Sequence, residues 1–209
     1  TEKWSAGFTL EGFYTHLENA FVLEEIGTDD FGKVFEKRNG NNAKVAGTTL
    51  ELRTNYNKKL QLEAGFTLQQ SKYENPVSYL EGIEATKSFL RTPDDYGFAN
   101  LNITPDKRWT VNLNYVYTGK MKIAHAGGAD NFPEDQMVHT KAFSEVNSKV
   151  SHTFSLSKFN NVIEIYGGVK NIFNAYQHDF DTGKNRDSNY IYGPNSPRTF
   201  FIGLKIKTP

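Results

Sequence analysis

The sequence of 209 residues contains no cysteine. This absence excludes a disulfide framework, a thiolate metal site and a cysteine nucleophile. Apolar runs are only a few residues long, which excludes a membrane-spanning helix because such a helix needs about 20 consecutive apolar residues. Charge of one sign is not in excess either, since 24 Lys and Arg residues balance 24 Asp and Glu residues. Proteins that bind nucleic acid usually carry a clustered basic excess, so no nucleic-acid partner is expected.

A catalytic constellation is also missing from the sequence. It has no G-x-S-x-G turn, and its serine and histidine residues are scattered without the spacing of a triad. The aspartates Asp179, Asp181 and Asp187 superficially suggest a calcium loop. However, Lys184 stands where an EF-hand needs glycine, and Tyr190 stands where it needs glutamate. We therefore expect no enzymatic activity, no cofactor and no bound metal, and we expect the aspartates to close turns within a loop.

Aromatic residues make up 14% of the chain, and they accompany an alternation of apolar and polar residues that is typical of strands. In residues 60–70, Leu62, Phe66 and Leu68 fall on one side of an extended chain, with Gln61 on the other. Eight stretches show this pattern: residues 4–14, 43–56, 60–70, 96–104, 109–117, 143–156, 162–173 and 198–206. Most are about ten residues or longer, whereas a strand in a globular protein usually has about five or six.

The connections between these stretches alternate in length. Residues 57–59, 105–108 and 157–161 are short, whereas residues 17–42, 74–95, 119–142 and 174–197 are long. In an up-and-down meander, this alternation places every short turn at one end and every long loop at the other. Transmembrane barrels sort their connections in this way, with strands of about ten residues that are apolar outside and polar inside. The predicted fold is therefore an all-β, antiparallel, up-and-down transmembrane β-barrel wall of about eight strands.

Two further patterns agree with a barrel in a membrane. Aromatic residues stand near strand ends, where an interfacial girdle would place them: Trp4, Tyr14, Tyr56, Trp109 and Tyr117. In the first long connection, FVLEE and KVFEKR flank GTDDFG, which predicts a small hairpin above the barrel rim. Two other classes remain open on the residues alone. These are a self-contained eight-stranded outer-membrane barrel with an adhesive or structural role, and a soluble β-rich binding domain.

Residues 167–206, GGVKNIFNAYQHDFDTGKNRDSNYIYGPNSPRTFFIGLKI, closely resemble the C-terminal end of TonB-dependent outer-membrane receptors, especially those of Bacteroidetes. The upstream pieces GFYTHLENAFVLEE, FEKRNGNNAKVAGTTLEL, KKLQLEAGFTLQQSKY and FLRTPDDYG resemble the same barrel in the same order. Members of that family have an N-terminal plug domain and a barrel of about 22 strands. The resemblance implies that residues 1–209 are the C-terminal part of such a barrel, with the plug domain absent from this chain.

The resemblance also implies a function and a location. Members of the family take up a scarce nutrient across the bacterial outer membrane: a ferric siderophore, haem, cobalamin or an oligosaccharide. The expected partners are therefore outer-membrane lipid, the nutrient ligand, and TonB with ExbB and ExbD, which would act through the plug domain.

The family captures its ligand partly with extracellular loops, and the long connections here hold side chains suited to that task. Aromatic rings can stack on a sugar, a corrin or a catecholate, and neutral imidazole is a good metal ligand. The expected ligand-binding residues are Tyr79, His125, Phe132, Tyr190 and Tyr192. The alternative roles for the aromatic residues among them are packing of one loop against another and membership of the outer aromatic girdle. The histidines lack metal-ligand spacing, so no metal site is expected among them.

The last predicted strand, residues 198–206, should form an edge of the wall. Phe200, Ile202 and Leu204 share one side of it, and Thr199 and Lys205 share the other. The apolar side is expected to face lipid, and the other side the lumen. In a complete receptor this strand pairs with the first strand of the barrel, which this chain does not contain. An unpaired edge is therefore expected.

Overall fold

The structure of the chain is a computed structural model that describes residues 3–30, 32–156, 161–194 and 196–207. Its strands are β1 (Trp4–Asp29), β2 (Gly32–Tyr56), β3 (Leu60–Val77), β4 (Thr86–Ser88), β5 (Asp95–Ile103), β6 (Trp109–Thr118), β7 (Lys122–His125), β8 (Gln136–His139), β9 (Phe143–Leu156), β10 (Asn161–Lys170) and β11 (Thr199–Lys207). No helix capable of crossing a membrane occurs in the described ranges.

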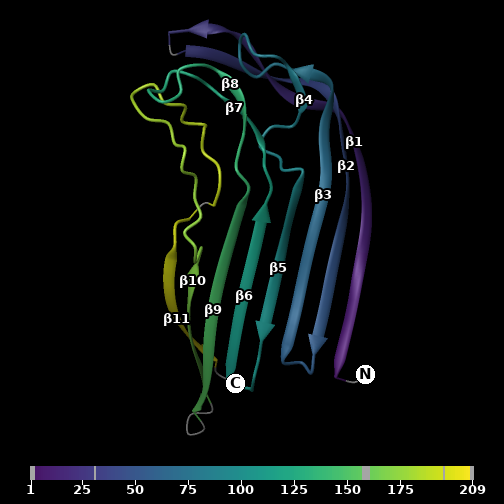
Figure 1. Cartoon of the computed structure of the whole chain (residues 1–209), viewed down its shortest axis with the longest axis vertical. Helices are drawn as coiled ribbons and strands as arrows, with labels where there is room; N and C mark the ends of the chain where they lie inside the picture. Colours follow the sequence, from purple (N-terminus) through teal and green to yellow (C-terminus); the bar gives the residue numbers. More distant parts are fainter. Residues whose placement is uncertain (1–2, 31, 157–160, 195, 208–209) are drawn as a thin grey trace.

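A nine-stranded antiparallel sheet contains eight strands in the order β1-β2-β3-β5-β6-β9-β10-β11, with β4 paired to β3 beside this path. The strands run side by side, with both chain termini at one end, here named the turn end, and the long connections at the other, the loop end (Figure 1). Among the described residues, β1 and β11 each pair on one side only, so the wall is open. The eight-stranded meander and the unpaired edge of the last strand are confirmed. Over the ranges that the structure describes, the strands form neither a two-layer sandwich nor a closed eight-stranded barrel.

The short connections at the turn end follow from their sequences. Asn57 and Lys58 have φ values of 54° and 56°. Two successive left-handed residues are typical of the tight turns whose twist matches a hairpin. In the connection at residues 105–108, the Asp106 carboxylate accepts a hydrogen bond from the Trp109 N–H at 3.0 Å. Residues 157–160, which make up most of the third predicted turn, lie outside the described residues.

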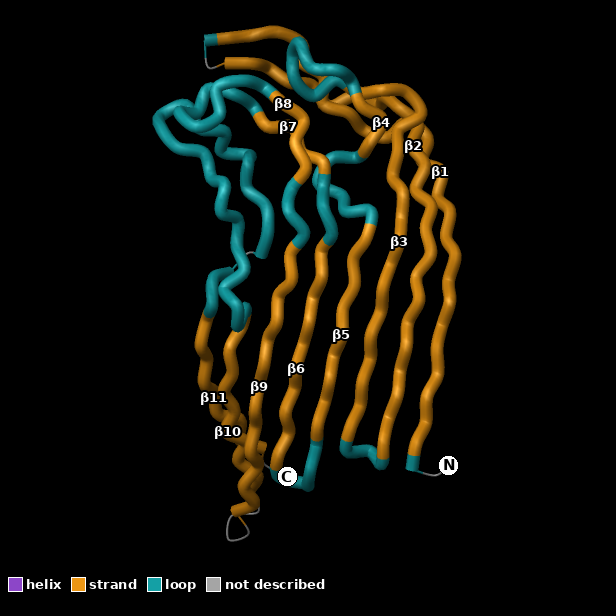
Figure 2. Tube along the Cα trace, in the orientation of Figure 1, coloured by secondary structure: helices purple, strands orange, loops and turns teal. Residues whose placement is uncertain are grey.

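The first long connection was predicted as a loop from residue 17 to residue 42, and this prediction is wrong. β1 continues to Asp29 and β2 begins at Gly32, and these two residues pair with each other. The predicted hairpin is therefore present, but it is the outer part of the first hairpin of the wall. Irregular register between residues 17 and 27 interrupts the alternation, because a bulge shifts side chains from one face to the other. The extension arches across the loop end (Figure 2).

Other elements also differ from the predicted ones. β3 extends to Val77 instead of residue 70, since its outer part pairs with β4 inside the second long connection. β7 and β8 pair with each other inside the third long connection. β10 ends at Lys170 instead of residue 173, because Asn171 adopts a φ of 49° and turns the chain out of the sheet.

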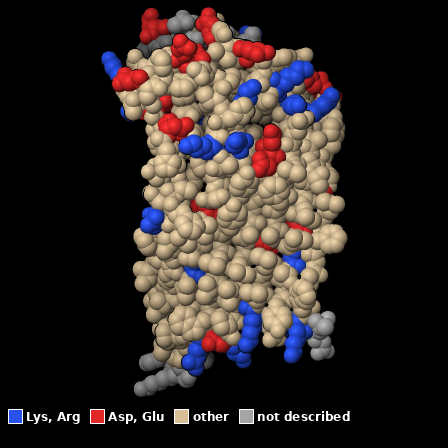
Figure 3. All heavy atoms as spheres, viewed as in Figure 1, with Lys and Arg blue, Asp and Glu red and all other residues tan. Residues whose placement is uncertain are grey.

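The two faces of the curved sheet differ in chemistry. On the convex face, the register aligns Leu62 with Leu101, and Leu101 with Leu113. On the concave face, the adjacent register aligns Asn100 with Asn114. Figure 3 shows charged side chains gathered toward the two ends of the convex face, with a largely uncharged band between them. The alternation in sequence has therefore become an apolar outer surface and a polar inner surface.

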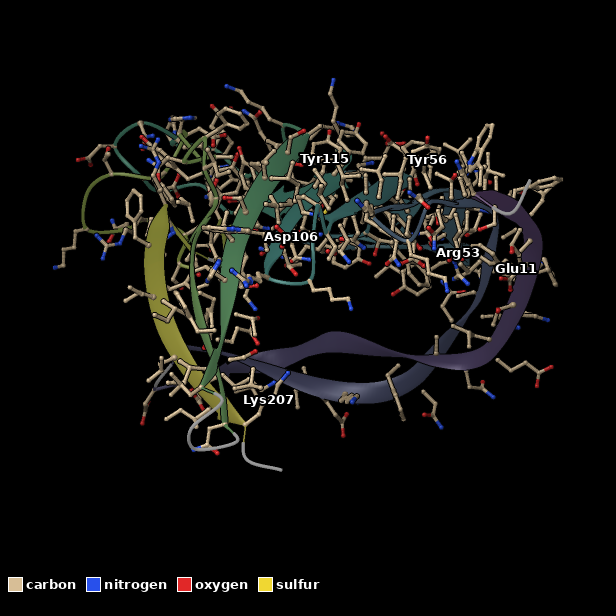
Figure 4. All side chains as sticks on the ribbon, turned by 90° about the horizontal axis from the view of Figure 1, so that it is seen from below. Glu11, Arg53, Tyr56, Asp106, Tyr115 and Lys207 are labelled. Carbon is tan, nitrogen blue, oxygen red and sulfur yellow. The ribbon has the colours of Figure 1, made fainter. Side chains whose placement is uncertain are left out.

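Apolar side chains on the convex face are exposed to an unusual degree. Phe8 is 74% exposed, and Ile202 is 84% exposed. Figure 4 shows Tyr56 and Tyr115 on this side of the wall, and Arg53 on the opposite, concave side. A continuous apolar surface of this kind marks contact with a membrane or with another protein.

The most buried side chains of the described structure lie at the loop end. The largest of them are Ile123, His125, Thr140, Asn171 and Gln177. Ile123 also forms a hydrophobic cluster with Tyr190 and Tyr192. The compact core of the described structure is therefore built from loops, above the wall.

Candidate functional site

His125, the last residue of β7, lies at the centre of the loop end. It is 1% exposed, and its ring stacks between Tyr190 and Phe132, with centroid distances of 3.5 Å and 3.6 Å. Its Nε2 lies 2.9 Å from Oδ1 of Asp181, whose side chain is only 3% exposed. The stack and the hydrogen bond join the third long connection to the fourth.

Asp181 and Asp187 fix the backbone of the same two connections. Oδ2 of Asp181 accepts a hydrogen bond from the Asp187 N–H at 2.9 Å. Oδ2 of Asp187 accepts one from the Ala126 N–H at 3.1 Å, and its Oδ1 accepts one from the Asn189 N–H at 2.8 Å. Asp187 therefore closes a turn as expected, whereas Asp181 also links the fourth connection to the third.

Asp179 and Gln177 organise the two tyrosines of the cluster. The hydroxyl of Tyr190 donates to Asp179 at 2.8 Å, and the hydroxyl of Tyr192 donates to the same carboxylate. Gln177, which is 2% exposed, donates from Nε2 to the Tyr190 carbonyl at 3.2 Å. Its Oε1 accepts from the Tyr192 N–H at 2.9 Å. Both tyrosines are thereby held at the backbone and at the hydroxyl.

Burial and these hydrogen bonds shift the ionisation of the cluster. Burial, together with the hydrogen bond to Asp179, raises the pKa of Tyr190 to about 12. The same two causes raise the pKa of Tyr192. Burial alone would raise the pKa of Asp179, but the hydrogen bonds from Tyr192 and Tyr190 outweigh it and hold that pKa below its ordinary value of 3.8. The preferred state is therefore one carboxylate that accepts from two neutral phenols.

Arg91 and Lys122 attach the second long connection to this assembly. The Arg91 guanidinium donates to the Ile191 carbonyl at 2.9 Å and also to the Asn189 carbonyl. The Lys122 ammonium donates to the Thr86 hydroxyl at 3.0 Å, and the Lys122 carbonyl accepts from the Arg91 N–H at 2.9 Å. The second, third and fourth long connections therefore form one braced unit.

Tyr79 has no hydrogen bond or ring contact with this cluster in the described structure. It lies between β3 and β4, and it is 36% exposed. Burial, and then the neighbouring Tyr73, raise the pKa of its phenol. The structure thus brings together four of the five expected ligand-binding residues and leaves Tyr79 apart. No observation tests ligand contact, so that role stays a prediction for all five.

The arrangement separates bracing side chains from side chains that a ligand can reach. The rings of His125 and Tyr190 stack on each other, and Nε2 of His125 and the Tyr190 hydroxyl form hydrogen bonds within the loops. Tyr176, Phe180 and Ile191 project from the same fourth connection and are 44%, 48% and 63% exposed. No group of three or more His, Asp or Glu side chains in the described ranges is arranged to hold a metal ion.

The concave face of the wall adds a polar surface below the loops. Nη2 of Arg53 lies 3.0 Å from Oε2 of Glu51, and Nε lies 2.9 Å from Oε1 of Glu63. Around these residues is an open groove of about 630 Å³. Its lining is Ser5, Ala6, Gly7, Arg53, Thr54, Asn55, Gln61, Leu62, Glu63, Asn100 and Asn102. Eight of these eleven residues have amide, hydroxyl or charged side chains.

An amide ladder crosses the concave face between strands. Nδ2 of Asn147 donates to Oδ1 of Asn114 at 2.8 Å, and Nδ2 of Asn114 donates to Oδ1 of Asn100 at 2.7 Å. At its upper end, Oδ1 of Asn147 accepts from the Asn171 N–H at 2.7 Å. The ladder therefore connects the wall to the start of the fourth long connection.

Sequence reasoning missed Arg91, Gln177 and Asn171. All three lie inside stretches that resemble TonB-dependent receptors, so the resemblance was a signal that could have singled them out. The carbonyl partners of the Arg91 side chain are about a hundred residues away in the chain, so no local pattern indicated them. The burial of Gln177 and Asn171 could not be read from their polarity.

Comparisons with known proteins agree with the fold. A family model described as "TonB dependent receptor-like, beta-barrel" matches residues 2–172. The ferric-catecholate import receptor Fiu of E. coli K12, in its closed form, has a TM-score of 0.62 at 20% identity. The match covers 95% of this chain and 25% of that one. The FrpB iron transporter of Neisseria meningitidis has a TM-score of 0.56 at 16% identity, with coverages of 98% and 29%.

At these identities the two structures show the fold alone. This chain spans between a quarter and a third of the length of either of them. No curated protein matches the sequence.

Proposed function

We propose a function from one premise, which the family match establishes: this chain belongs to the TonB-dependent receptor-like β-barrel family. Proteins of this family are outer-membrane transporters and not enzymes. We propose that the chain is the C-terminal part of such a barrel in a bacterial outer membrane. There it would serve TonB-dependent active uptake of a scarce nutrient. The match over residues 2–172 is the observation that carries the proposal.

The convex face supports the membrane location. Its apolar band on β1 runs from Trp4 to Tyr14, and both residues are at least 60% exposed. Ten steps of about 3.3 Å along a strand tilted by about 40° span about 25 Å, which is the height of the apolar band on outer-membrane barrels. The aromatic residues at its ends would then lie at the two lipid–water interfaces.

The open edges support a place within a larger barrel. β1 and β11 each have one partner strand among the described residues, and backbone groups without partners are costly in lipid. Further strands would pair with both edges. The plug domain, and through it TonB with ExbB and ExbD, would act on this wall from other parts of the receptor.

Among the nutrients that the family transports, we propose a ferric chelate for this receptor. The two structural neighbours are named as a ferric-catecholate importer and an iron transporter. The exposed aromatic side chains of the loop end, Tyr79, Tyr176 and Phe180, suit stacking on catecholate rings. Haem, cobalamin and oligosaccharides are the alternatives that an uptake assay separates.

The test is uptake of radiolabelled iron by a Gram-negative host that lacks its own siderophore receptors and expresses the receptor containing this chain. We expect uptake of a ferric catecholate to require both the receptor and TonB. Growth rescue by haem, cobalamin or an oligosaccharide in place of the ferric chelate would replace the proposed substrate. Loss of TonB dependence would overturn the transport mechanism itself.

Alanine variants at Tyr79, Tyr176 and Phe180 locate the ligand-binding surface. A ring that stacks on the ligand contributes about 0.5–1.5 kcal/mol, so its loss should weaken apparent affinity by roughly two- to twelve-fold. Lys184→Ala, on an exposed side chain of the fourth long connection, is the matched control. If none of the three variants differs from that control, these aromatic side chains do not bind the ligand.

A further inference from the structure

A row of basic side chains crosses the convex face at the loop end of the apolar band. The register aligns His16 on β1 with Lys44 on β2, and Lys44 with Lys72 on β3. All three are exposed, and they share their face with Tyr14 and Leu68. They are named here the basic row. It lies at the level where the side chains of these three strands change from apolar to charged.

The row has more positive charge than its own acid neutralises. Lys44 and Lys72 are directly opposite each other on neighbouring strands, an arrangement that is destabilising for like charges. Glu74 lies beside them, with Oε1 at 2.8 Å from the Lys44 ammonium and 3.6 Å from Nε2 of His16. Its Oε2 accepts from Nδ2 of Asn42 at 3.2 Å. Both carboxylate oxygens of Glu74 therefore already have partners, and neither is paired with Lys72.

Lys72 is left without an anionic partner. Its ammonium forms no hydrogen bond or ion pair within the described ranges, and no other carboxylate of those ranges neutralises the row. An uncompensated cation beside a paired one is an electrostatic arrangement that a phosphate would complete.

Between the basic row and the middle of the apolar band, the side chains on the convex face are short. Gly12 aligns with Thr48, and Tyr14 aligns with Ala46, so small side chains occupy the space between Tyr14 and Leu68. The position that a Cβ of Gly12 would take is open space. The small residues thus leave an apolar lane that runs along the strands from the basic row.

We propose that the basic row and this lane bind a phosphate-bearing lipid of the membrane leaflet at the loop end. Lys72 and Lys44 would contact the headgroup phosphate, and an acyl chain would lie over Gly12, Ala46 and Thr48. A free phosphate would use the lysines but not the lane, which is why we assign the lipid. The inference rests on the proposed membrane location.

The test uses the full receptor that contains this chain, purified in detergent, and measures lipid retention by native mass spectrometry. The probes are phosphatidic acid and diacylglycerol with identical acyl chains. A basic side chain near an anionic membrane surface strengthens binding by about five-fold. The Lys44→Gln, Lys72→Gln double variant should therefore bind phosphatidic acid roughly twenty-five-fold more weakly, and diacylglycerol as the wild type does.

A charge-matched control removes two lysines from the turn end. Lys59→Gln with Lys107→Gln should leave retention of phosphatidic acid unchanged. Equal binding of the two probes by the wild type, or equal retention by the two double variants, overturns the lipid site. Displacement of the lipid by inorganic phosphate alone would also overturn it, because the acyl chain would then contribute nothing.

A separate measurement on the same preparation tests the proposed membrane location. Insertion of the receptor into lipid vesicles, read as protection of the wall from added protease, tests the membrane location without reference to the basic row. A receptor that does not insert contradicts the proposed location. A receptor that inserts but binds both probes equally contradicts only the lipid site.

Discussion

The wall and the loop end of this molecule bury their side chains in opposite ways. In the wall, each strand exposes apolar residues on the convex face and polar residues on the concave face, with no layer of side chains enclosed between them. At the loop end, Ile123, His125 and Gln177 are each at most 2% exposed. The wall lies between two media, whereas the loops surround a core of their own.

The difference explains why similar polar groups have different roles in the two regions. Asn114 belongs to the concave amide ladder, where water can replace a lost partner. Asn171 is 1% exposed, so a group there that loses its partner stays unpaired and retains the cost of its desolvation. The surrounding medium, more than the residue type, decides how much each hydrogen bond contributes.

The largest expected effect comes from placing a charge on the apolar face of the wall. Leu113 lies in the middle of β6 on the convex face and is 38% exposed. Leu113→Arg should lower the free energy of unfolding in lipid vesicles by about 2–4 kcal/mol, because a guanidinium at the bilayer midplane is poorly solvated. Denaturant titration of the reconstituted receptor measures the change.

The matched control is the neighbouring residue on the other face. Asn112 points to the concave side, where Asn112→Arg should cost less than about 1 kcal/mol. Equal costs at the two positions would mean that the convex face does not contact hydrocarbon.

A smaller loss of stability is expected when a buried asparagine of the loop core is replaced, and a still smaller one for an asparagine of the concave face. The Asn171 side chain donates to the Ala175 and Ser196 carbonyls at 2.8 Å and 2.9 Å, and accepts from the Ala175 N–H at 2.8 Å. Asn171→Ala should cost about 2–3 kcal/mol, since it removes buried hydrogen bonds at a residue with positive φ. Asn114→Ala should cost about 0.5–1 kcal/mol, because water reaches its partners. Denaturant titration of both variants compares them, and the reverse order would contradict a wet concave face.

The wall could be predicted from the sequence because apolar residues for the convex face alternate with polar residues for the concave face along each strand. Alternation with period two identified all eight long strands, and the alternating connection lengths placed the turns and loops at opposite ends. The outer half of the first hairpin could not be found in this way. Its bulges between residues 17 and 27 shift the faces, and no single pattern survives them.

The loop core was predictable only in part, because its contacts join residues far apart in the chain. His125 and Asp181 are separated by 56 positions, and nothing local to either residue indicates the other. Aromatic and histidine content drew attention to His125, Phe132, Tyr190 and Tyr192, but it could not distinguish a ligand surface from a packed interior. Tyr79 has the same chemistry and lies elsewhere.

The smallest expected effect is a dependence on acid that is confined to the loop end. The folded pKa of Asp179 lies below its ordinary value of 3.8, so its contribution to stability is present above that value and is lost as the pH falls through the folded pKa. Acidification should therefore lower the hydrogen-exchange protection of the Tyr192 amide by a few-fold, while amides of the wall keep theirs. Asp179→Asn cannot ionise and should remove this step. If the step persists in that variant, or appears equally in the wall, the tyrosine–carboxylate hydrogen bonds do not hold the loop core together.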